Sequence, residues 1–301
     1  MIFNTSTVPG GPNLIKSATA PRVFFVDSNG GGSTTSGGKT PESAFTTIDS
    51  AIGACTASRG DIIYVLAGHA ETISAAAGIA ADVAGISIIG CGNGINRPVL
   101  TLSATDSTIA VSAANITFKN IVIKSSVNEL VKVFNITAAY CTLDAVDYID
   151  NGAAKETIQF ILTTNAADYL TVQNCYHVQL TAAASTMRWI YLVGTEGARI
   201  LNNTFILKLA DNATDAVISA DGNSRLTEIG GNKMHVTGYT AALVSAVIGA
   251  SGATGIHYDG RYYADAAAVT TINDTPSMAS FEVYCSNDLD KNGILDPVVG
   301  S

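Results

Sequence analysis

The segment Leu170-Thr171-Val172-Gln173-Asn174 decides the fold, because similar short pieces return along the chain at nearly constant spacing. Four of the six pieces alternate apolar and polar residues and then reach Asn, Asp or Gly. This pattern is typical of a strand that runs into a tight turn. The six pieces are residues 86–90, 116–120, 141–144, 170–174, 198–202 and 226–230.

The first residues of successive pieces are 30, 25, 29, 28 and 28 positions apart, a period in the range that indicates a solenoid. A second strand-like run often follows a piece, as at 121–123, 176–178, 205–207 and 234–236. A third precedes the next piece, at 108–111, 133–136, 158–162, 189–193 and 216–219. Three short strands per coil predict an all-β parallel β-helix. A β-sandwich would need hairpin turns every 8–12 residues, and Asn-Gly and Asp-Gly pairs are too few and irregular for that.

The composition agrees with a compact β protein. Of 301 residues, 47% are hydrophobic and only 14% are charged, against about 25% in a typical soluble domain. The low charge excludes disordered chains and coiled coils, which are charge-rich. The net charge of -9 and the pI near 4.8 argue against binding to nucleic acid or to an anionic membrane surface.

A helix is expected before the repeats begin. Thr40 is a suitable N-cap, Pro41 suits the first helical position, and Glu42 favours the positive end of a helix. Apolar residues then recur at helical spacing on one face: Phe45, Ile48, Ile52 and Cys55. We predict a helix over about 41–57, followed by a strand that starts at Ile62.

This opening resembles the pectate-lyase-like right-handed parallel β-helix families. The residues that carry the resemblance are Val26-Asp27, a Gly/Ser loop, Thr40-Pro41, Ala44 to Ile48, Ala51-Ile52, Gly60-Asp61, Ile63, Val65 and Ala67-Gly68. The resemblance implies a right-handed, single-stranded parallel β-helix whose N-terminal helix covers the open end of the stack. Such an end exposes unpaired backbone and apolar core, so an amphipathic element is needed there.

Three zones follow. Residues 1–22 are predicted to form an extended arm, which is either a frayed terminus or a segment that docks on a neighbouring subunit. Residues 23–240 form the β-helix with its N-terminal cap. Residues 241–301 lose the repeat and are expected to form a C-terminal cap or interaction region, in which Tyr258, Tyr262 and Tyr263 are either cap residues or interface anchors.

The best local motif for a metal lies near the C-terminus. Residues 288–296 resemble a calcium loop of the EF-hand or dockerin type, with Gly293 at its sixth position. The candidate ligands are Asp288, Asp290, Asn292, Ile294 (through its backbone) and Asp296. Val299 stands where an EF-hand has its bidentate Glu, which excludes a full EF-hand. The alternative is a polar C-terminal turn. No cofactor is expected to be required.

No catalytic set is predicted. Glycoside hydrolysis would need two converging carboxylates. Asp144 and Asp147 should point to opposite faces of an extended strand. Both sets of acidic residues are interpreted as solvated turn residues: Asp144, Asp147 and Asp150 in one coil, and Asp211, Asp215 and Asp221 in turn-like sequence. The catalytic motifs of pectate lyases and polygalacturonases are not visible, and Gly68-His69-Ala70-Glu71 is interpreted as structural. Trp189 is expected in a strand, and the His residues have no recurrent spacing.

The cysteines and the hydropathy indicate the cellular compartment in which the protein is expected. The five cysteines are dispersed without metal-ligand spacing, which favours small buried thiols in a reducing cytoplasm. Met1-Ile2-Phe3-Asn4 does not read as a signal peptide, and no apolar run is long enough for a membrane helix.

The overall pattern resembles short β-helix proteins encoded by tailed bacteriophages. That resemblance implies a structural virion protein, most simply a capsid decoration (cement) or head-associated protein assembled in the host cytoplasm. It further implies a homotrimer that binds the major capsid protein or other virion subunits, with the arm as anchor. The alternatives are a polysaccharide lyase or hydrolase of the tailspike type and a non-catalytic module that binds a glycan or host surface.

Overall fold

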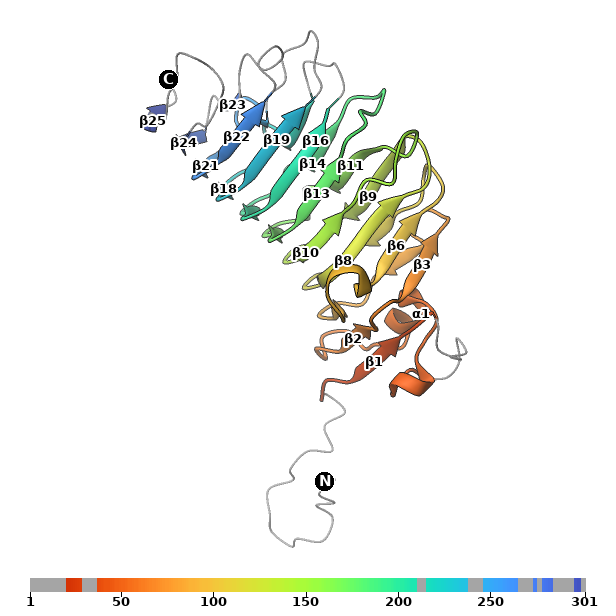
Figure 1. Ribbon diagram of the computed structural model, residues 1–301. Coiled ribbons are helices and arrows are strands. Elements are labelled where there is room, and N and C mark those ends of the chain that lie inside the picture. The colour runs from red at the N-terminus through yellow and green to blue at the C-terminus, as the bar shows by residue number, and fades with distance from the viewer. Residues whose placement is uncertain are drawn as a thin grey trace, which may run out of the picture.

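The chain folds into a parallel β-solenoid of about seven turns with very little helix, as the sequence repeat predicts (Figure 1). The computed structural model describes residues 20–28, 37–209, 215–237 and 246–264, together with three strands between residues 273 and 298. In this part of the chain, strands of successive coils pair in parallel and form three stacks, which we call face 1, face 2 and face 3.

The strands of each face follow one another along the column. Face 1 contains β1 (Val23–Val26), β2 (Ile62–Val65), β5 (Ser87–Gly90), β8 (Thr117–Ser125), β10 (Thr142–Tyr148), β12 (Thr171–Gln173), β15 (Arg199–Leu201), β18 (Thr227–Gly230), β21 (Gly255–Tyr258) and β24 (Met278–Val283). Face 2 contains β3 (Ala70–Ile73), β6 (Val99–Leu102), the second halves of β8 and β10, β13 (Tyr176–Gln179), β16 (Thr204–Lys208), β19 (Lys233–Thr237) and β22 (Arg261–Ala264). Face 3 contains β4 (Ile79–Ala81), β7 (Ile109–Val111), β9 (Leu130–Ile136), β11 (Thr157–Thr163), β14 (Arg188–Leu192), β17 (Ala216–Ala220), β20 (Val247–Gly249) and β23 (Asn273–Asp274).

The register confirms the predicted repeat except at its last step. Thr117, Thr142, Thr171 and Arg199 are paired partners in successive coils, so the steps are 25, 29 and 28 residues. Arg199 then pairs with Glu228, a step of 29 rather than the predicted 28. The extra residue lies before the strand, where the chain changes direction, and leaves the inward apolar pattern of the strand intact.

Left-handed residues form two columns at the corners of the solenoid. The corner between faces 1 and 2, which we call the Asn corner, has positive φ at Asn120, Ala145, Asn174, Asn202, Gly231 and Asp259. The corner between faces 3 and 1, which we call the Tyr corner, has positive φ at Gly60, Gly85, Asn115, Tyr140, Tyr169, Gly197 and Leu226. Each column occupies equivalent register positions, because every coil must make the same sharp bend. Asn and Gly tolerate this conformation, whereas other residues are strained in it.

We expect Ala145→Gly to stabilise the fold. Ala145 has φ 53°, where an L side chain costs about 1 kcal/mol or more, and glycine removes that cost. The gain should be about 0.5–1 kcal/mol, because glycine also has more freedom in the unfolded chain. The matched control is Ala110→Gly in β7, which should lose about that amount. Urea unfolding measures both, and a loss of stability with Ala145→Gly would contradict the strain argument.

The interior is a continuous apolar column that runs through every described coil. Phe118, Phe134 and Phe160 form edge-to-face contacts with ring centroids 5.4 and 5.5 Å apart. Trp189 stacks on Phe160 at 5.6 Å and is fully buried, so its predicted place in a strand is confirmed. Such aromatic pairs contribute beyond their buried area, which favours one fixed packing of the coils.

The first strand does not end in an open edge. The Phe25 N–H donates to Gly38 O at 2.7 Å, the Phe45 N–H donates to Phe25 O at 2.8 Å, and the Asp27 N–H donates to Phe45 O at 2.8 Å. Val26 and Phe45 form a parallel bridge. The segment from Gly38 to Phe45 therefore satisfies backbone groups that an edge strand would leave open.

The predicted helix over 41–57 is shorter in the structure. It consists of a 3-10 turn, η2 (Pro41–Ser43), and a helix of six residues, α1 (Ile48–Gly53), which begins after Thr47 as N-cap. Ala44 is extended, because Phe45 pairs with β1 instead of continuing the helix. The buried face of α1 contains Ile48, Ala51 and Ile52, and α1 contacts β1, β2 and β4. That α1 caps the column, and that the coil is right-handed, stay predictions.

Parallel pairing continues past residue 240, where the sequence repeat fades. β20, β21 and β22 pair with β17, β18 and β19 of the preceding coil. β24 pairs with β21, and β25 (Leu295–Val298) pairs antiparallel with β24. Tyr258 donates its hydroxyl to Glu228 Oε1 at 2.7 Å and Tyr262 is buried against His257, so both tyrosines act within the chain. The side chain of Tyr263 and the predicted arm up to residue 19 lie outside the described residues.

Candidate functional site

The Asn corner brings together two carboxylates that the sequence placed apart. The left-handed bend at Ala145 lies between Asp144 and Asp147, so both point outward while Leu143 and Val146 point into the core. The expectation that the two carboxylates face opposite sides of one strand is therefore wrong. A strict two-residue alternation holds only for an uninterrupted strand, and this strand bends from face 1 onto face 2.

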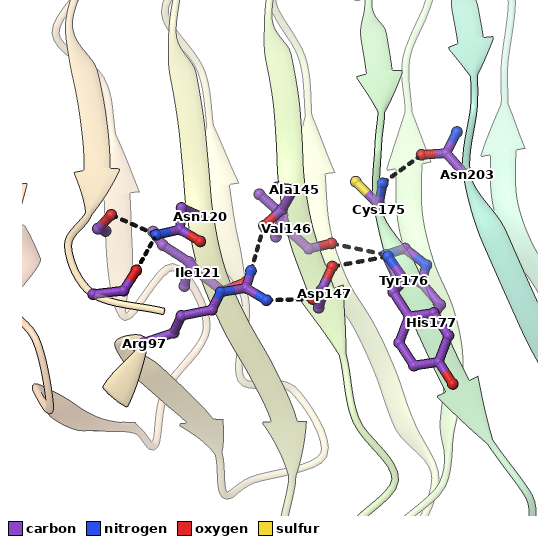
Figure 2. A network of polar contacts seen from close by, with 12 residues as sticks. Arg97, Asn120, Ile121, Ala145, Val146, Asp147, Cys175, Tyr176, His177 and Asn203 are labelled. Atoms are coloured by element: carbon purple, nitrogen blue, oxygen red, sulfur yellow. Dashed lines mark hydrogen bonds and ion pairs between the residues drawn. The ribbon is translucent and has the colours of Figure 1, made fainter. Parts of the chain in front are cut away.

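Arg97 connects three coils at this corner. Its guanidinium forms an ion pair with Asp147 and donates to Ala145 O at 2.5 Å and Ile121 O at 3.2 Å (Figure 2). Arg97 follows the 3-10 turn η3 (Gly94–Asn96), which lies in the loop between β5 and β6. The loop is further fixed by Asn120, whose side-chain amide donates to Gly90 O and Gly92 O at 2.8 and 3.0 Å. Sequence analysis missed Arg97, because its partners lie 24 to 50 residues away.

Each carboxylate at the corner is fully engaged. Asp147 accepts from Arg97 and, through Oδ1, from the Tyr176 N–H at 2.8 Å. Asp144 accepts from Lys119 Nζ at 2.7 Å and from the side-chain amide of Asn174 at 2.8 Å. Burial alone would raise the pKa of the Asp144 carboxyl, but the hydrogen bonds and the charge of Lys119 outweigh burial and lower the pKa.

We expect acid to weaken the fold through such carboxylates. The pKa values of Asp61, Asp144 and Glu228 all lie below their ordinary values near 4. Their stabilisation is therefore complete above about pH 4 and is lost as the pH falls through the lowered values. Because Lys119 is half exposed, water screens its pair, and Asp144→Asn should cost no more than about 1 kcal/mol at pH 7. Urea midpoints of the native chain and Asp144→Asn from pH 5 to pH 2 test this, because the difference between them should shrink as the carboxylate is protonated, and a difference that stays constant would contradict it.

A ladder of buried side chains supports the corner from inside. The Cys175 N–H donates to Asn203 Oδ1 and the Asn203 N–H donates to Asn232 Oδ1, both at 2.9 Å. Asn203 and Asn232 are buried, and their amide groups also donate to Val172 O and Ile200 O at 3.0 and 2.8 Å. Every bond in the ladder satisfies a polar group that the bend would otherwise leave unpaired.

Carboxylates elsewhere in the solenoid also link neighbouring coils or elements through hydrogen bonds. Many accept a backbone N–H from a neighbouring coil or element and so replace ladder bonds lost at turns. The donor N–H groups and their acceptors are Ala80 to Asp49, Leu180 to Asp150, Glu196 to Asp168, Met187 to Asp215 and Gly194 to Asp221. Asp215 is fully buried, so its interpretation as a solvated turn residue is wrong. Asp211 lies outside the described residues.

Gly68-His69-Ala70-Glu71 fixes the start of the column, in agreement with its structural interpretation. The Ser28 N–H donates to His69 Nδ1 at 2.9 Å, so the other ring nitrogen carries the proton and donates to Glu71 at 3.1 Å. Glu71 also accepts from the Ile48 N–H at 3.0 Å, at the beginning of α1. The Ser28 hydroxyl accepts from the Ala70 N–H at 2.9 Å. This arrangement holds three elements together and is not a nucleophilic triad.

His177 is a fully buried titratable group in the described core. The Trp189 ring N–H donates to His177 Nδ1 at 2.7 Å, and His177 Nε2 donates to Val146 O at 2.9 Å. Burial lowers the pKa of His177 to about 3, which the hydrogen bond to Val146 only partly opposes. The ring is therefore neutral, with the tautomer fixed by its two partners.

The predicted calcium loop lies almost wholly outside the described residues. Asp288, Asp290, Asn292 and Ile294 are not described, and Asp296 is placed only as a backbone position in β25. Within the residues that are described, no group of three or more His, Cys, Asp or Glu could hold a metal ion. No helix in that part of the chain is long and apolar enough to cross a membrane.

The described cysteines have the character of structural thiols. Cys55, Cys91, Cys141 and Cys175 are free, and burial raises the pKa of each thiol, to about 12 for Cys55 and Cys175. A raised pKa keeps a thiol protonated and unreactive at neutral pH.

No protein-family model, curated protein or solved structure matches the chain. The fold itself defines the class of protein, a parallel β-solenoid. At its Asn corner, carboxylates form hydrogen bonds and ion pairs that link neighbouring coils.

Proposed function

We propose that this chain is a non-enzymatic structural protein whose β-solenoid is a stiff column. The observation that carries the proposal is the engagement of the carboxylates at the Asn corner. A general acid needs a raised pKa near the working pH, whereas Asp144 has a lowered pKa, and both Asp144 and Asp147 use their oxygens to tie coils together. Chemistry at this corner would break the contacts that hold the column.

The particular role that we propose is that of a bacteriophage capsid decoration or head-associated protein. This part rests on the resemblance to short β-helix proteins of tailed phages. Residues 1–22 would be the anchor to the major capsid protein or another virion subunit, and the column would form oligomers, as trimers in that resemblance. A weakly charged column is suited to lying against other subunits.

Sedimentation with virus particles tests this role. We expect the full chain, added to particles that lack it, to move with them through a density gradient. A chain without residues 1–20 should stay in the free fraction. A full chain that remains free at all concentrations would overturn the particle role. Equal incorporation of both chains would keep the particle role and remove the arm as anchor.

A polysaccharide lyase or hydrolase is the second candidate, because one corner holds two carboxylates beside Lys119 and Arg97. Under this alternative, purified protein would release products from acidic glycans, and Asp147→Asn would abolish the release. Under the structural proposal, no turnover is expected from either protein. Binding on a glycan array without product would instead favour a glycan- or host-binding module.

A further inference from the structure

We infer that copies of this chain associate side by side, with the Tyr corner of one copy seated on face 2 of the next. The inference deepens the proposed function, since it names the surfaces through which a structural oligomer would form. It rests only on the oligomer in that proposal and needs no particle.

Apolar side chains are concentrated on these two surfaces. Six of the ten large hydrophobic side chains that are exposed in the described part of the chain lie on them. They are Tyr140, Tyr169 and Leu226 at the Tyr corner, and Ile149, Tyr176 and Leu180 on or beside face 2. Val178 and Ile206, which are half-buried, extend the face 2 patch from β13 to β16. Exposed apolar side chains gathered on one surface are typical of interaction sites.

Face 2 is basic, although the chain is acidic overall. Its outward positions carry Lys124, Lys208, Lys233 and Arg261, and none of them forms an ion pair among the described residues. Asp147 is the outward carboxylate described on these strands, and Arg97 neutralises it. Asp150 lies beside Ile149 at the rim of face 2 and accepts from the Leu180 and Gly152 N–H groups. In a chain of net charge -9, this face therefore attracts an acidic partner.

The Tyr corner supplies the complementary chemistry. Tyr140 and Tyr169 stack with ring centroids 4.8 Å apart and an interplanar angle of 10°, so they form one rigid apolar ridge. Asp168 and Glu196 flank Tyr169 along the ridge, and the Glu196 N–H donates to Asp168 Oδ1 at 2.8 Å. In the following coil, the position that pairs with Glu196 in a parallel bridge is Arg225, so the ridge also carries one positive charge. In the coils of Tyr169 and Glu196, apolar and acidic groups thus face apolar and basic groups, whereas in the coil of Arg225 the residue of face 2 is also basic, Lys233.

The two surfaces match in height, because each coil contributes to both. Tyr169 and Tyr176 belong to one coil, and Glu196 and Lys208 belong to the next. The contact spans about 14 Å along the column for four coils. The Tyr corner and face 2 lie on opposite sides of each coil, since the chain passes from face 1 through face 2 to face 3. The contact is therefore heterologous: it closes into a ring only when successive copies are not shifted along the axis and are also rotated by a fixed fraction of a turn, and without such a rotation it forms an open row.

A matched pair of isoleucines tests the apolar part. Ile149 on face 2 and Ile256 on face 1 are both 39% exposed, but only Ile149 lies in the proposed contact. We expect sedimentation velocity to show a concentration-dependent oligomer, with Ile149→Asp raising its dissociation constant at least tenfold and Ile256→Asp leaving it unchanged. Circular dichroism and thermal melts confirm that both variants are folded. A wild-type chain that stays monomeric up to about 100 μM, or equal effects of the two variants, would overturn the inference.

Exchanging the charges of Glu196 and Lys208 tests whether the same coil of two neighbouring copies meets in the contact. Glu196→Lys and Lys208→Glu should each raise the dissociation constant several-fold, and the double variant should restore association. Additive losses in the double variant would exclude the proposed alignment. Particle sedimentation distinguishes this inference from the proposed function. Oligomers that do not bind particles would support the side-by-side contact and overturn the particle role. Monomers that bind particles would support the particle role and overturn the side-by-side contact.

Discussion

Replacing Asp61 with asparagine is expected to lower the free energy of unfolding by about 3 kcal/mol, the lower end of the range for breaking a buried ion pair. Asp61 is fully buried and accepts from Arg59 Nε at 2.6 Å and from the Arg22 and Thr56 N–H groups, each at 2.8 Å. Burial would raise the pKa of Asp61, but these hydrogen bonds outweigh it and lower the pKa. Asparagine removes the charge and leaves the covered Arg59 guanidinium without its counterion.

The double variant Asp61→Asn with Arg59→Met is the control. Removing both charges should restore part of the lost stability, because no buried charge then lacks a partner. Urea unfolding at pH 7 compares the native chain with both variants. A loss below about 1 kcal/mol for Asp61→Asn, or a double variant less stable than the single one, would show that Asp61 and Arg59 do not form a stabilising buried ion pair.

Stability should fall steadily as the pH drops from 7 to 4, because His177 is neutral in the folded chain. Its pKa is about 3 in the fold and about 6.5 in the unfolded chain, so only the unfolded chain binds a proton in this range. The slope approaches about 1.4 kcal/mol per pH unit, and the loss from pH 7 to pH 4 is about 3 kcal/mol. The sign is fixed, since a lowered pKa in the fold always favours unfolding as protons are added.

His177→Gln isolates this effect. A glutamine can accept from the Trp189 ring N–H and donate to Val146 O, but it cannot bind a proton in this range. We expect its unfolding free energy to be nearly constant between pH 6.5 and pH 4.5, whatever its value at pH 7. An unchanged slope in His177→Gln would show that the histidine is protonated in the fold.

The repeat itself was predictable, and the structure explains its one error. The apolar positions that point inward alternate within each strand, so a period near 28 residues can be counted without coordinates. The predicted strand piece began at Leu226, one residue before the position that the strand pairing gives. Leu226 belongs to the Tyr corner, where the repeat is defined by backbone conformation rather than by residue type. Gly197, Tyr169 and Leu226 share the left-handed conformation but have no side-chain chemistry in common.

The helix and the corner needed tertiary information for the same reason. The apolar spacing of Phe45 and Ile48 fits a helix. Phe45 instead pairs with Val26, because this pairing satisfies backbone groups at an otherwise open strand edge. Asp144 and Asp147 seemed to face opposite sides until the bend at Ala145 turned the strand.

The sequence by itself determined an all-β solenoid with three strands per coil, because the repeat is written in local apolar alternation. It also determined that chemistry would be sparse, since so few charged residues are present. Only the tertiary structure decided what those charges do. The partners of Arg97, Asp147 and Asp61 lie mostly one or two coils away, and stacking coils at about 4.8 Å brings together residues that the sequence separates by 24 to 50 positions.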